Sequence, residues 1–145
     1  EKRLIIEVTG HDATRWCLYE RDAFDRILLD VPCSSERHVL QSDRALREWS
    51  PNRTKHLAVQ AFSFLASALE VVKPGGLIVY ATCALSPAEN DDVIKKLIAR
   101  RGERVEIVPP ETGIGEKTEL GRLILPDTTD GRGPQYIAKI RRKSY

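Results

Sequence analysis

The amino-acid sequence predicts an α/β fold with a largely parallel sheet. Short apolar runs alternate with two longer segments in which apolar residues recur at every third or fourth position. The run at 77–82 is mostly apolar on both faces, which is typical of a buried parallel strand. With 145 residues, 41% of them hydrophobic and 30% charged, the chain is neither disordered nor collagen-like. We expect residues 1–145 to form a single domain.

The N-terminal third contains two predicted strands. Residues 3–9 form a run rich in β-branched residues that ends at Gly10, and residues 24–29 form a second apolar run. The second run leads into Asp30-Val31-Pro32-Cys33, where the proline cannot donate a hydrogen bond to a sheet and therefore ends the strand. We expect the charged segment 34–49 to be a surface loop or a short helix.

A long amphipathic helix is predicted to follow. Ser50 suits the N-cap position, and Pro51 suits the first helical position. Pro74-Gly75-Gly76 is expected to stop the helix before the strand at 77–82. The predicted apolar face of this helix consists of Ala58, Ala61, Phe62, Leu65, Ala68, Leu69 and Val72.

The second half of the chain predicts one more helix and three short strands. Ser86-Pro87-Ala88-Glu89 matches a capping box with proline at the first helical position. We expect that helix to end at Gly102. Its predicted core side consists of Val93, Ile94, Leu97 and Ile98. The strands are predicted at 105–108, 123–125 and 135–140, and the last two, joined by a turn at 130–134, are expected to form a hairpin at one edge of the sheet.

Charge, apolar runs and cysteine content argue against a membrane-spanning helix and against a disulfide-rich protein. Lys and Arg number 23 against 21 Asp and Glu, a net charge of +2, and no apolar run approaches the roughly 18 residues of a membrane helix. Three widely spaced cysteines, Cys17, Cys33 and Cys83, fit free thiols in a reducing compartment. Because the chain has no Met, we expect it to be a processed or partial product, with any targeting segment outside it.

Two of the cysteines follow predicted strands. Cys33 comes three residues after Asp30, and Cys83 follows the strand at 77–82. Ligands bind at the carboxyl ends of strands in open α/β sheets, so neighbouring strands would bring a carboxylate and two thiols into one cleft. A single cysteine at a strand end is more often a small buried hydrophobe. A metal site is not expected, because the chain has no CxxC and its three histidines are scattered.

The same segments resemble the motifs of a known family. Asp30-Val31-Pro32-Cys33-Ser34-Ser35 is similar to the Asp-Ala/Val-Pro-Cys-Ser motif of the NSUN (Sun-domain) family of RNA cytosine-C5 methyltransferases. The stretch 73–83, followed by Glu89-Asn90, resembles that family's Pro-Gly-Gly-x-Leu-Val-Tyr-Ser-Thr-Cys…Glu-Asn motif. Arg37-His38 and the stretch 133–139 are most similar to the mitochondrial members. The resemblance covers essentially the whole chain and implies a Rossmann-like fold that binds S-adenosyl-L-methionine.

The resemblance implies roles for four side chains. Cys83 would be the nucleophile, adding to carbon 6 of cytosine so that carbon 5 can attack a methyl sulfonium. Asp30 would contact the cytosine near N3 and N4 and lie near the cofactor. Cys33 would assist removal of the carbon-5 proton and release of the product, a role that requires a locally lowered pKa. Asp12 resembles the acidic residue that binds the adenine amino group, whereas its position alone indicates an ordinary turn-capping aspartate.

The chain also departs from the family pattern. Ala81 stands where a serine is usual, which we expect only to tune activity. The Ala-Pro-Gly-Gly-Lys loop that holds the methionine end of the cofactor is absent, because the only Gly-Gly, at 75–76, precedes a strand. The chain therefore resembles the C-terminal part of the catalytic domain. In the family's sheet two further strands lie between 3–9 and 24–29, so we expect the 145 residues alone not to form a stable cofactor-binding unit.

RNA binding is weakly encoded. Two basic clusters are candidates for phosphate contacts, and each is equally well explained as a solvated surface. They consist of Lys95, Lys96, Arg100, Arg101 and Arg104, and of Lys139, Arg141, Arg142 and Lys143. Trp16 and Trp49 could stack on a base, although packing explains them better.

The sequence thus favours an S-adenosylmethionine-dependent RNA cytosine-5 methyltransferase acting on ribosomal or transfer RNA. A targeting protein or a ribosomal assembly intermediate is a further candidate partner, no membrane association is expected, and the resemblance favours a mitochondrial location over a cytoplasmic or nuclear one. The first alternative is a methyltransferase-fold RNA-binding or ribosome-assembly factor whose catalysis is dispensable. The second is a DNA cytosine-5 methyltransferase with Cys33 as nucleophile, a scheme in which Thr82-Cys83 has no place.

Overall fold

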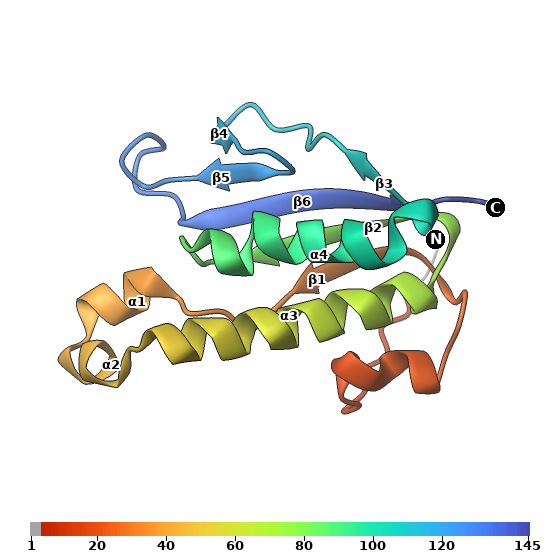
Figure 1. Cartoon of the computed structure of the whole chain (residues 1–145), viewed down its shortest axis with the longest axis horizontal. Helices are drawn as coiled ribbons and strands as arrows, with labels where there is room; N and C mark the ends of the chain where they lie inside the picture. The colour runs from red at the N-terminus through yellow and green to blue at the C-terminus, as the bar shows by residue number, and fades with distance from the viewer. Residues whose placement is uncertain (1–3) are drawn as a thin grey trace.

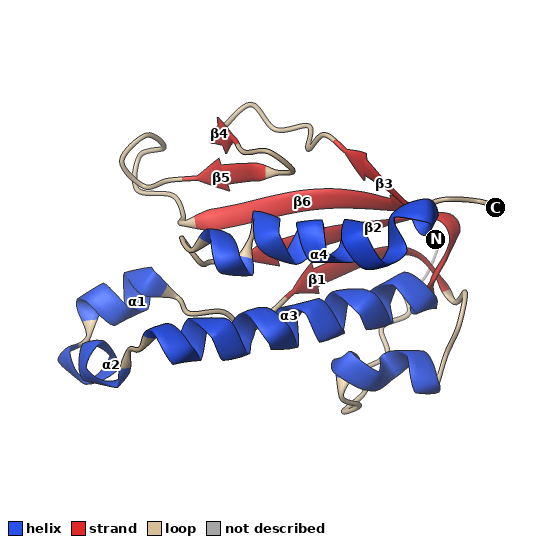
Figure 2. Ribbon diagram, viewed as in Figure 1, coloured by secondary structure: helices blue, strands red, loops and turns tan. Residues whose placement is uncertain are grey.

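The computed structural model describes residues 4–145, in which six strands form one mixed sheet (Figure 1). The strands are β1 (Phe24–Asp30), β2 (Val72–Thr82), β3 (Val105–Val108), β4 (Glu116–Lys117), β5 (Arg122–Ile124) and β6 (Gln135–Arg142). The α-helices are α1 (Glu36–Gln41), α2 (Asp43–Glu48), α3 (Pro51–Val71) and α4 (Asp91–Arg101). Three 3₁₀ helices are η1 (Ala13–Leu18), η2 (Pro87–Glu89) and η3 (Gly102–Arg104). Figure 2 shows α3 and α4 on the same side of the sheet.

The long helix α3 begins as the sequence predicts. The Ser50 hydroxyl accepts a hydrogen bond from the backbone N–H of Arg53 at 3.3 Å, which caps the helix. The helix ends at Val71, before the predicted stop, and β2 begins at the next residue, so the Pro-Gly-Gly segment lies inside β2. A Cβ on Gly76 would lie 2.8 Å from the backbone oxygen of Asp25, so glycine allows β1 to approach there.

The sheet confirms the α/β fold class, but its strand directions differ from the expectation. β1 and β2 run parallel, whereas β6 runs antiparallel to β2, β3 and β5, as β4 does to β5. The predicted β5–β6 hairpin is present, and β6 lies inside the sheet beside β2 rather than at its edge. The short strand β4 was not predicted, because two residues carry no detectable pattern.

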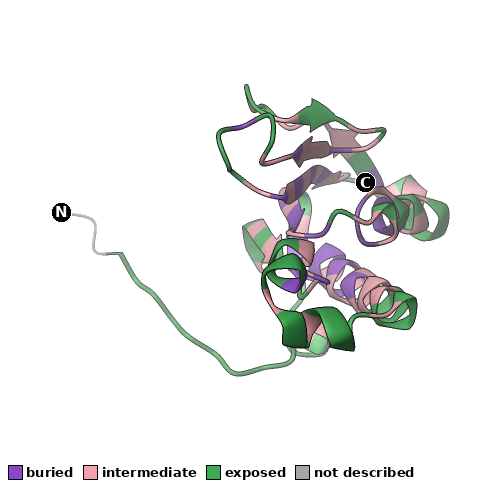
Figure 3. Cartoon of the chain, turned by 90° about the vertical axis from the view of Figure 1, so that its left-hand side faces the viewer, coloured by how far each residue is buried: buried purple, intermediate pink, exposed green. Residues whose placement is uncertain are grey.

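The strand predicted at 3–9 is not formed by residues 4–9, the part of it that the structure describes. Residue 3 lies outside the described residues, and residues 4–9 run away from the sheet without strand pairing (Figure 3). Leu4, Ile5 and Val8 are 85%, 89% and 89% exposed. A strand needs a partner for its backbone groups, and the described chain offers none beside this segment.

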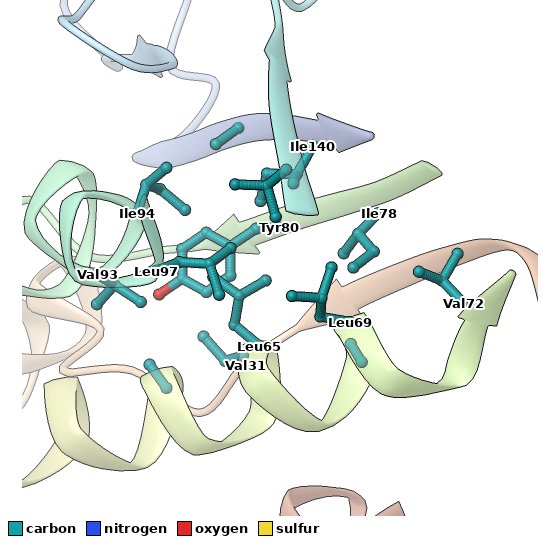
Figure 4. Close-up of a cluster of buried hydrophobic side chains, with 14 of the residues drawn as sticks. Val31, Leu65, Leu69, Val72, Ile78, Tyr80, Val93, Ile94, Leu97 and Ile140 are labelled. Atoms are coloured by element: carbon teal, nitrogen blue, oxygen red, sulfur yellow. The ribbon is translucent and has the colours of Figure 1, made fainter. Parts of the chain in front are cut away.

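The charged segment after β1 forms the two short helices α1 and α2, and α4 buries the face that the sequence predicts. Val93, Ile94 and Leu97 of α4 are at most 2% exposed. They join α3 and the sheet in one apolar cluster (Figure 4). Val31, the residue directly after Asp30, is 4% exposed and belongs to the same cluster, which anchors the loop that follows β1.

The C-terminal end of the last strand is bonded to the junction between α3 and β2. Arg142 donates hydrogen bonds to the backbone oxygens of Leu69 and Val72, at 3.2 and 2.6 Å, and pairs with Asp22. A cation at the C-terminal end of a helix stabilises it, because the last carbonyl groups carry partial negative charge. In the described part of the chain, no helix has the length and apolar character to cross a membrane.

Candidate active site

The two cysteines predicted to share an edge of the sheet are in contact. In the parallel pair of β1 and β2, Asp30 lies opposite Ala81, so both following segments leave the sheet at the same edge. The Cys33 and Cys83 sulfur atoms lie 2.6 Å apart, and both cysteines are free and half-buried. The backbone N–H of Cys83 also donates to the Cys33 sulfur at 3.2 Å. The geometry therefore brings two thiols and the end of β1 together, as the sequence predicts.

Asn90 braces the segment that carries Cys83. Its Oδ1 accepts from the Thr82 hydroxyl at 2.6 Å, and its Nδ2 donates to the backbone oxygen of Ala84 at 2.8 Å. These bonds fix the residues on either side of Cys83, and all the groups are buried. Hydrogen bonds between buried groups are costly to break, because each group would be left without water or a partner.

Glu89 braces the other cysteine segment, which corrects the predicted capping box. Ser86 does accept from the Ala88 N–H at 3.3 Å, but only the 3₁₀ turn η2 follows. The Glu89 carboxylate does not reach back to Ser86. It is 1% exposed and accepts from the Ser34 backbone N–H at 2.8 Å. A tertiary partner next to Cys33 thus replaces the local contact that the pattern indicated.

The Ser34 hydroxyl connects two carboxyl groups. Its oxygen lies 2.6 Å from Glu89 Oε2 and 2.7 Å from Glu36 Oε1. One hydroxyl has one hydrogen, so the Ser34 hydroxyl shares it between the two carboxylates. Burial raises the pKa of Glu89, and the hydrogen bonds from Ser34 offset part of that effect. The Ser34 hydroxyl is thus a donor shared by Glu89 and Glu36, and it joins η2 to α1.

A shallow hollow opens beside Cys83. It has a volume of about 290 Å³ and is lined by Ser35, Arg37, His38, Gln41, Cys83, Gly133 and Pro134. Arg37 donates to the backbone oxygens of Gly131 and Gly133, at 2.9 and 2.6 Å. The guanidinium therefore joins α1 to the loop before β6 and forms one wall of the hollow.

The environment of Cys33 differs from what its predicted role requires. Burial, followed by the contact with Cys83, raises the pKa of Cys33 to about 11, although Ser35 and the Cys83 N–H partly counteract this. A base role requires a lowered pKa. In this structure Cys33 is therefore a protonated thiol at neutral pH.

The two predicted carboxylates lie on different elements. Asp30 ends β1, and its side chain is exposed and makes no hydrogen bond within the described residues. Asp12 caps η1, accepting from the N–H and the hydroxyl of Thr14 at 2.9 and 2.7 Å, which lowers its pKa. The turn-capping interpretation of Asp12 is thus realised, and both of these bonds go to Oδ1.

Most side chains of the two basic clusters form ion pairs or cation–π contacts with other residues of the chain. Lys95 pairs with Glu119, Arg104 with Glu70, Lys139 with Glu111, Arg141 with Glu106 and Arg142 with Asp22. Lys96 and Arg100 lie over the ring of Phe62. Trp16 donates to Glu20, and Trp49 is 44% exposed at the end of α2. Residues 4–145 contain no group of three or more Cys, His, Asp or Glu side chains suited to a metal ion.

Three contributors to this site were not predicted from the sequence. Ser35, two residues after the motif cysteine Cys33, has its hydroxyl oxygen 3.1 Å from the sulfur of Cys83. Arg37 lines the hollow beside Cys83, and Glu89 supports the segment that follows Cys33 by accepting from the Ser34 N–H. Glu89 carried a signal, because the pair Glu89-Asn90 belongs to the motif that resembles the family pattern. Nothing in the local pattern indicates the contacts of Arg37, which join residues 94 and 96 positions apart in the chain.

Comparison with known families agrees with this geometry. The model of the family described as 16S rRNA methyltransferase RsmB/F matches residues 1–141. The chain belongs to the RsmB/F family. The predicted resemblance to RNA cytosine-C5 methyltransferases is confirmed by curated relatives of that kind.

Several curated relatives share the RsmB/F sequence pattern. The mitochondrial tRNA (cytosine(34)-C(5))-methyltransferase of Mus musculus is 32% identical over 151 residues, which covers 95% of this chain and 42% of the relative. Ribosomal RNA small subunit methyltransferase F of Cronobacter sakazakii is 36% identical over 126 residues, covering 83% of this chain and 26% of the relative. The chain thus spans less than half the length of the curated relatives it matches.

Solved structures show the same fold. NSun6 from Pyrococcus horikoshii, solved with SFG, superposes with a TM-score of 0.77 at 25% identity over 96% of this chain and 35% of that structure. A methyltransferase homolog protein from the same organism gives a TM-score of 0.69 at 31% identity, covering 90% of this chain and 42% of the other. The Rossmann-like methyltransferase fold predicted for this RsmB/F member is confirmed.

Proposed function

We propose that this chain is the C-terminal part of the catalytic domain of an S-adenosylmethionine-dependent enzyme that methylates carbon 5 of cytosine in RNA. The observation that carries the proposal is the contact between the Cys33 and Cys83 sulfurs at the carboxyl ends of two parallel strands, in an RsmB/F family member. The names of the relatives support ribosomal or transfer RNA as the substrate.

Cys83 supplies the nucleophile in this proposal. Carbon 5 of cytosine is a poor nucleophile until the thiolate of Cys83 adds to carbon 6, which forms an S–C6 bond and moves the ring electrons towards carbon 5. S-adenosylmethionine, when bound, supplies the methyl group that carbon 5 takes. Loss of the carbon-5 proton then allows the S–C6 bond to break and returns the electron pair to the sulfur. The target base must leave its stack to reach Cys83.

Asp30 acts on the pyrimidine edge. Addition to carbon 6 places negative charge on the ring, and a carboxylate that contacts the cytosine near N3 and the exocyclic amine supports the proton uptake that this addition requires. The exposed Asp30 side chain, which makes no hydrogen bond within the described residues, supports this role. Asp30 pairs with Ala81 across β1 and β2. Cys33 follows Asp30 by three residues, and Cys83 follows Ala81 by two.

Cys33 acts as a thiol rather than as a resting base. Its raised pKa keeps the proton on sulfur, and its sulfur touches that of Cys83. A neutral thiol beside Cys83 donates a hydrogen bond to the leaving sulfur when the S–C6 bond breaks, which favours product release. Removal of the carbon-5 proton by Cys33 requires that the thiol first lose its own proton.

The residues fit one side of the cofactor. The Asp30 carboxylate and Oδ2 of Asp12 are open acceptors that suit the hydrogen-bond donors of the adenosyl group. We therefore assign Asp12 and Asp30 to cofactor binding. The Gly-rich loop that the family uses for the methionine end does not occur in this sequence, so the fit is limited to the adenosyl side.

A mitochondrial location is part of the proposal, since one relative carries that location in its name. A targeting protein or a ribosomal assembly intermediate is the proposed partner. The loop before β6 and helix α1, which border the hollow at Cys83, are the surface where RNA would enter.

Trapping of a covalent adduct tests the function. The complete protein is incubated with S-adenosylmethionine and candidate ribosomal or transfer RNA carrying 5-fluorocytosine, whose fluorine blocks the final elimination. We expect a covalent band on a denaturing gel for the wild type, for Cys33→Ala and for the control Cys17→Ala, and none for Cys83→Ala. Loss in Cys33→Ala alone would exchange the two cysteine roles. No band in any form would favour the RNA-binding assembly factor.

A further inference from the structure

Ser35 adopts a backbone conformation that serine seldom occupies. Its φ is 53° and its ψ is 56°, in the left-handed region that favours glycine. It stands at the N-cap of α1, where serine normally accepts a hydrogen bond from the first turn of the helix, yet it makes no such bond. Ser42 and Ser50, at the N-caps of α2 and α3, both make that bond. Ser35 therefore lacks the stabilising N-cap hydrogen bond and has a strained backbone conformation.

The Ser35 hydroxyl turns to the two thiols instead. Its oxygen lies 3.1 Å from the Cys83 sulfur and 3.6 Å from the Cys33 sulfur. Its other contact is the backbone oxygen of Cys33 at 3.4 Å, a long bond that a rotating hydroxyl gives up easily. Ser35 also lines the hollow beside Cys83, so the group lies on the side from which a base would arrive.

We propose that Ser35 is a positioning residue that donates a hydrogen bond to the thiolate of Cys83 and selects this sulfur, rather than that of Cys33, as the nucleophile. Before ionisation the hydroxyl can accept from the Cys83 thiol while donating to the Cys33 backbone oxygen. When the Cys83 proton passes to solvent water, the hydroxyl rotates and donates to the sulfur. The inference rests on the proposed function for its use in catalysis, but the contact itself concerns only the thiol.

The asymmetry of the two thiols supports the choice. Cys83 has the shorter contact with the hydroxyl, whereas burial raises the pKa of Cys33 to about 11, so that Cys33 remains a thiol. A thiolate is stabilised by hydrogen-bond donors, and a donor to a charged group contributes more than one to a neutral group. The same bond stabilises the sulfur again when it leaves carbon 6.

The test uses substitutions that separate the hydroxyl from the backbone. Ser35→Gly removes the hydroxyl and suits a positive φ, so it relieves strain rather than adding it. Ser35→Asn also tolerates this conformation and returns an N–H donor. Asp130→Gly is the matched control, because Asp130 has a φ of 54°, is exposed and lies outside the hollow. Thermal unfolding of each complete protein checks that it folds.

The readout is the rate at which iodoacetamide alkylates Cys83 as a function of pH, without RNA. Arg37 and Lys55 lie between the two cysteines, so tryptic peptides report each thiol separately. The charged and titratable groups on the surrounding elements stay unchanged in all variants. They are Asp30, Cys33, Glu36, Arg37, His38 and Glu89.

We expect Ser35→Gly to raise the midpoint of the Cys83 profile by about one pH unit, a tenfold loss of thiolate below the midpoint. Ser35→Asn should recover part of the shift, and Asp130→Gly should match the wild type. The rate of adduct formation with 5-fluorocytosine RNA should fall by about the same factor in Ser35→Gly. A Ser35→Gly protein that folds and keeps the wild-type midpoint overturns the inference. Absence of an adduct in the wild type overturns the proposed function alone, since alkylation still reports on Ser35.

Discussion

Replacement of Glu89 is the sharpest test of how the site is held together. Glu89→Ala leaves the buried Ser34 N–H without an acceptor, which costs about 1–3 kcal/mol, and removes the hydroxyl contact, which costs about 1 kcal/mol more. We therefore expect the free energy of unfolding to fall by about 2–4 kcal/mol. Glu89→Gln keeps a carbonyl oxygen for the N–H and offers an amide donor to the hydroxyl, which can still donate to Glu36, so it should cost less than about 1 kcal/mol.

Urea unfolding of the complete proteins measures the difference, with the exposed Glu103→Ala as control. The raised pKa of Glu89 adds a pH test. A group with a raised folded pKa stabilises the protein fully below its unfolded value of 4.5 and loses that contribution as the pH rises. The wild type should therefore lose stability relative to Glu89→Gln above pH 4.5. Equal destabilisation by glutamine and alanine would refute the role of the Glu89 side chain as the acceptor for the Ser34 N–H.

Two further predictions follow from the same geometry. The pKa of Cys33 is raised from 9.0 to about 11, so the wild type should lose stability between those pH values, because the unfolded thiol ionises first; a Cys33→Ala variant with the same slope would contradict this. Leu28 of β1 is 75% exposed, and one edge of this strand has no partner within the described residues. The isolated 145 residues should therefore show no sharp thermal transition and no binding of S-adenosylmethionine. Calorimetry that shows both a sharp transition and binding would disprove this prediction.

Features set by nearby residues could be predicted from the sequence. The cap at Ser50 and the apolar period of α3 are local, so the start of the helix was predicted correctly. The contact of Cys33 with Cys83 was predictable because parallel neighbours end at one edge. The strand at 3–9 failed because strand formation depends on a partner and not only on β-branched residues.

Features set by distant residues were not predictable. Glu89 sits where a capping box expects it, but its carboxylate binds Ser34, 55 positions away, because a buried N–H there needs an acceptor. The sequence likewise indicates that 135–140 is a strand without indicating its neighbours. Ser35 appears as an ordinary N-cap serine until its backbone conformation and its distance to sulfur are known.

The position of β6 has a consequence for how the chain folds. β6 is the last strand, yet it lies between β2 on one side and β3 and β5 on the other. Its Arg142 bonds to Asp22, 120 positions earlier. Contacts between residues far apart in the sequence slow folding, because the entropy cost of closing the long loop arises before the contacts stabilise the chain. During synthesis, the β2 edge that supports Cys83 therefore stays unpaired until β6 has left the ribosome.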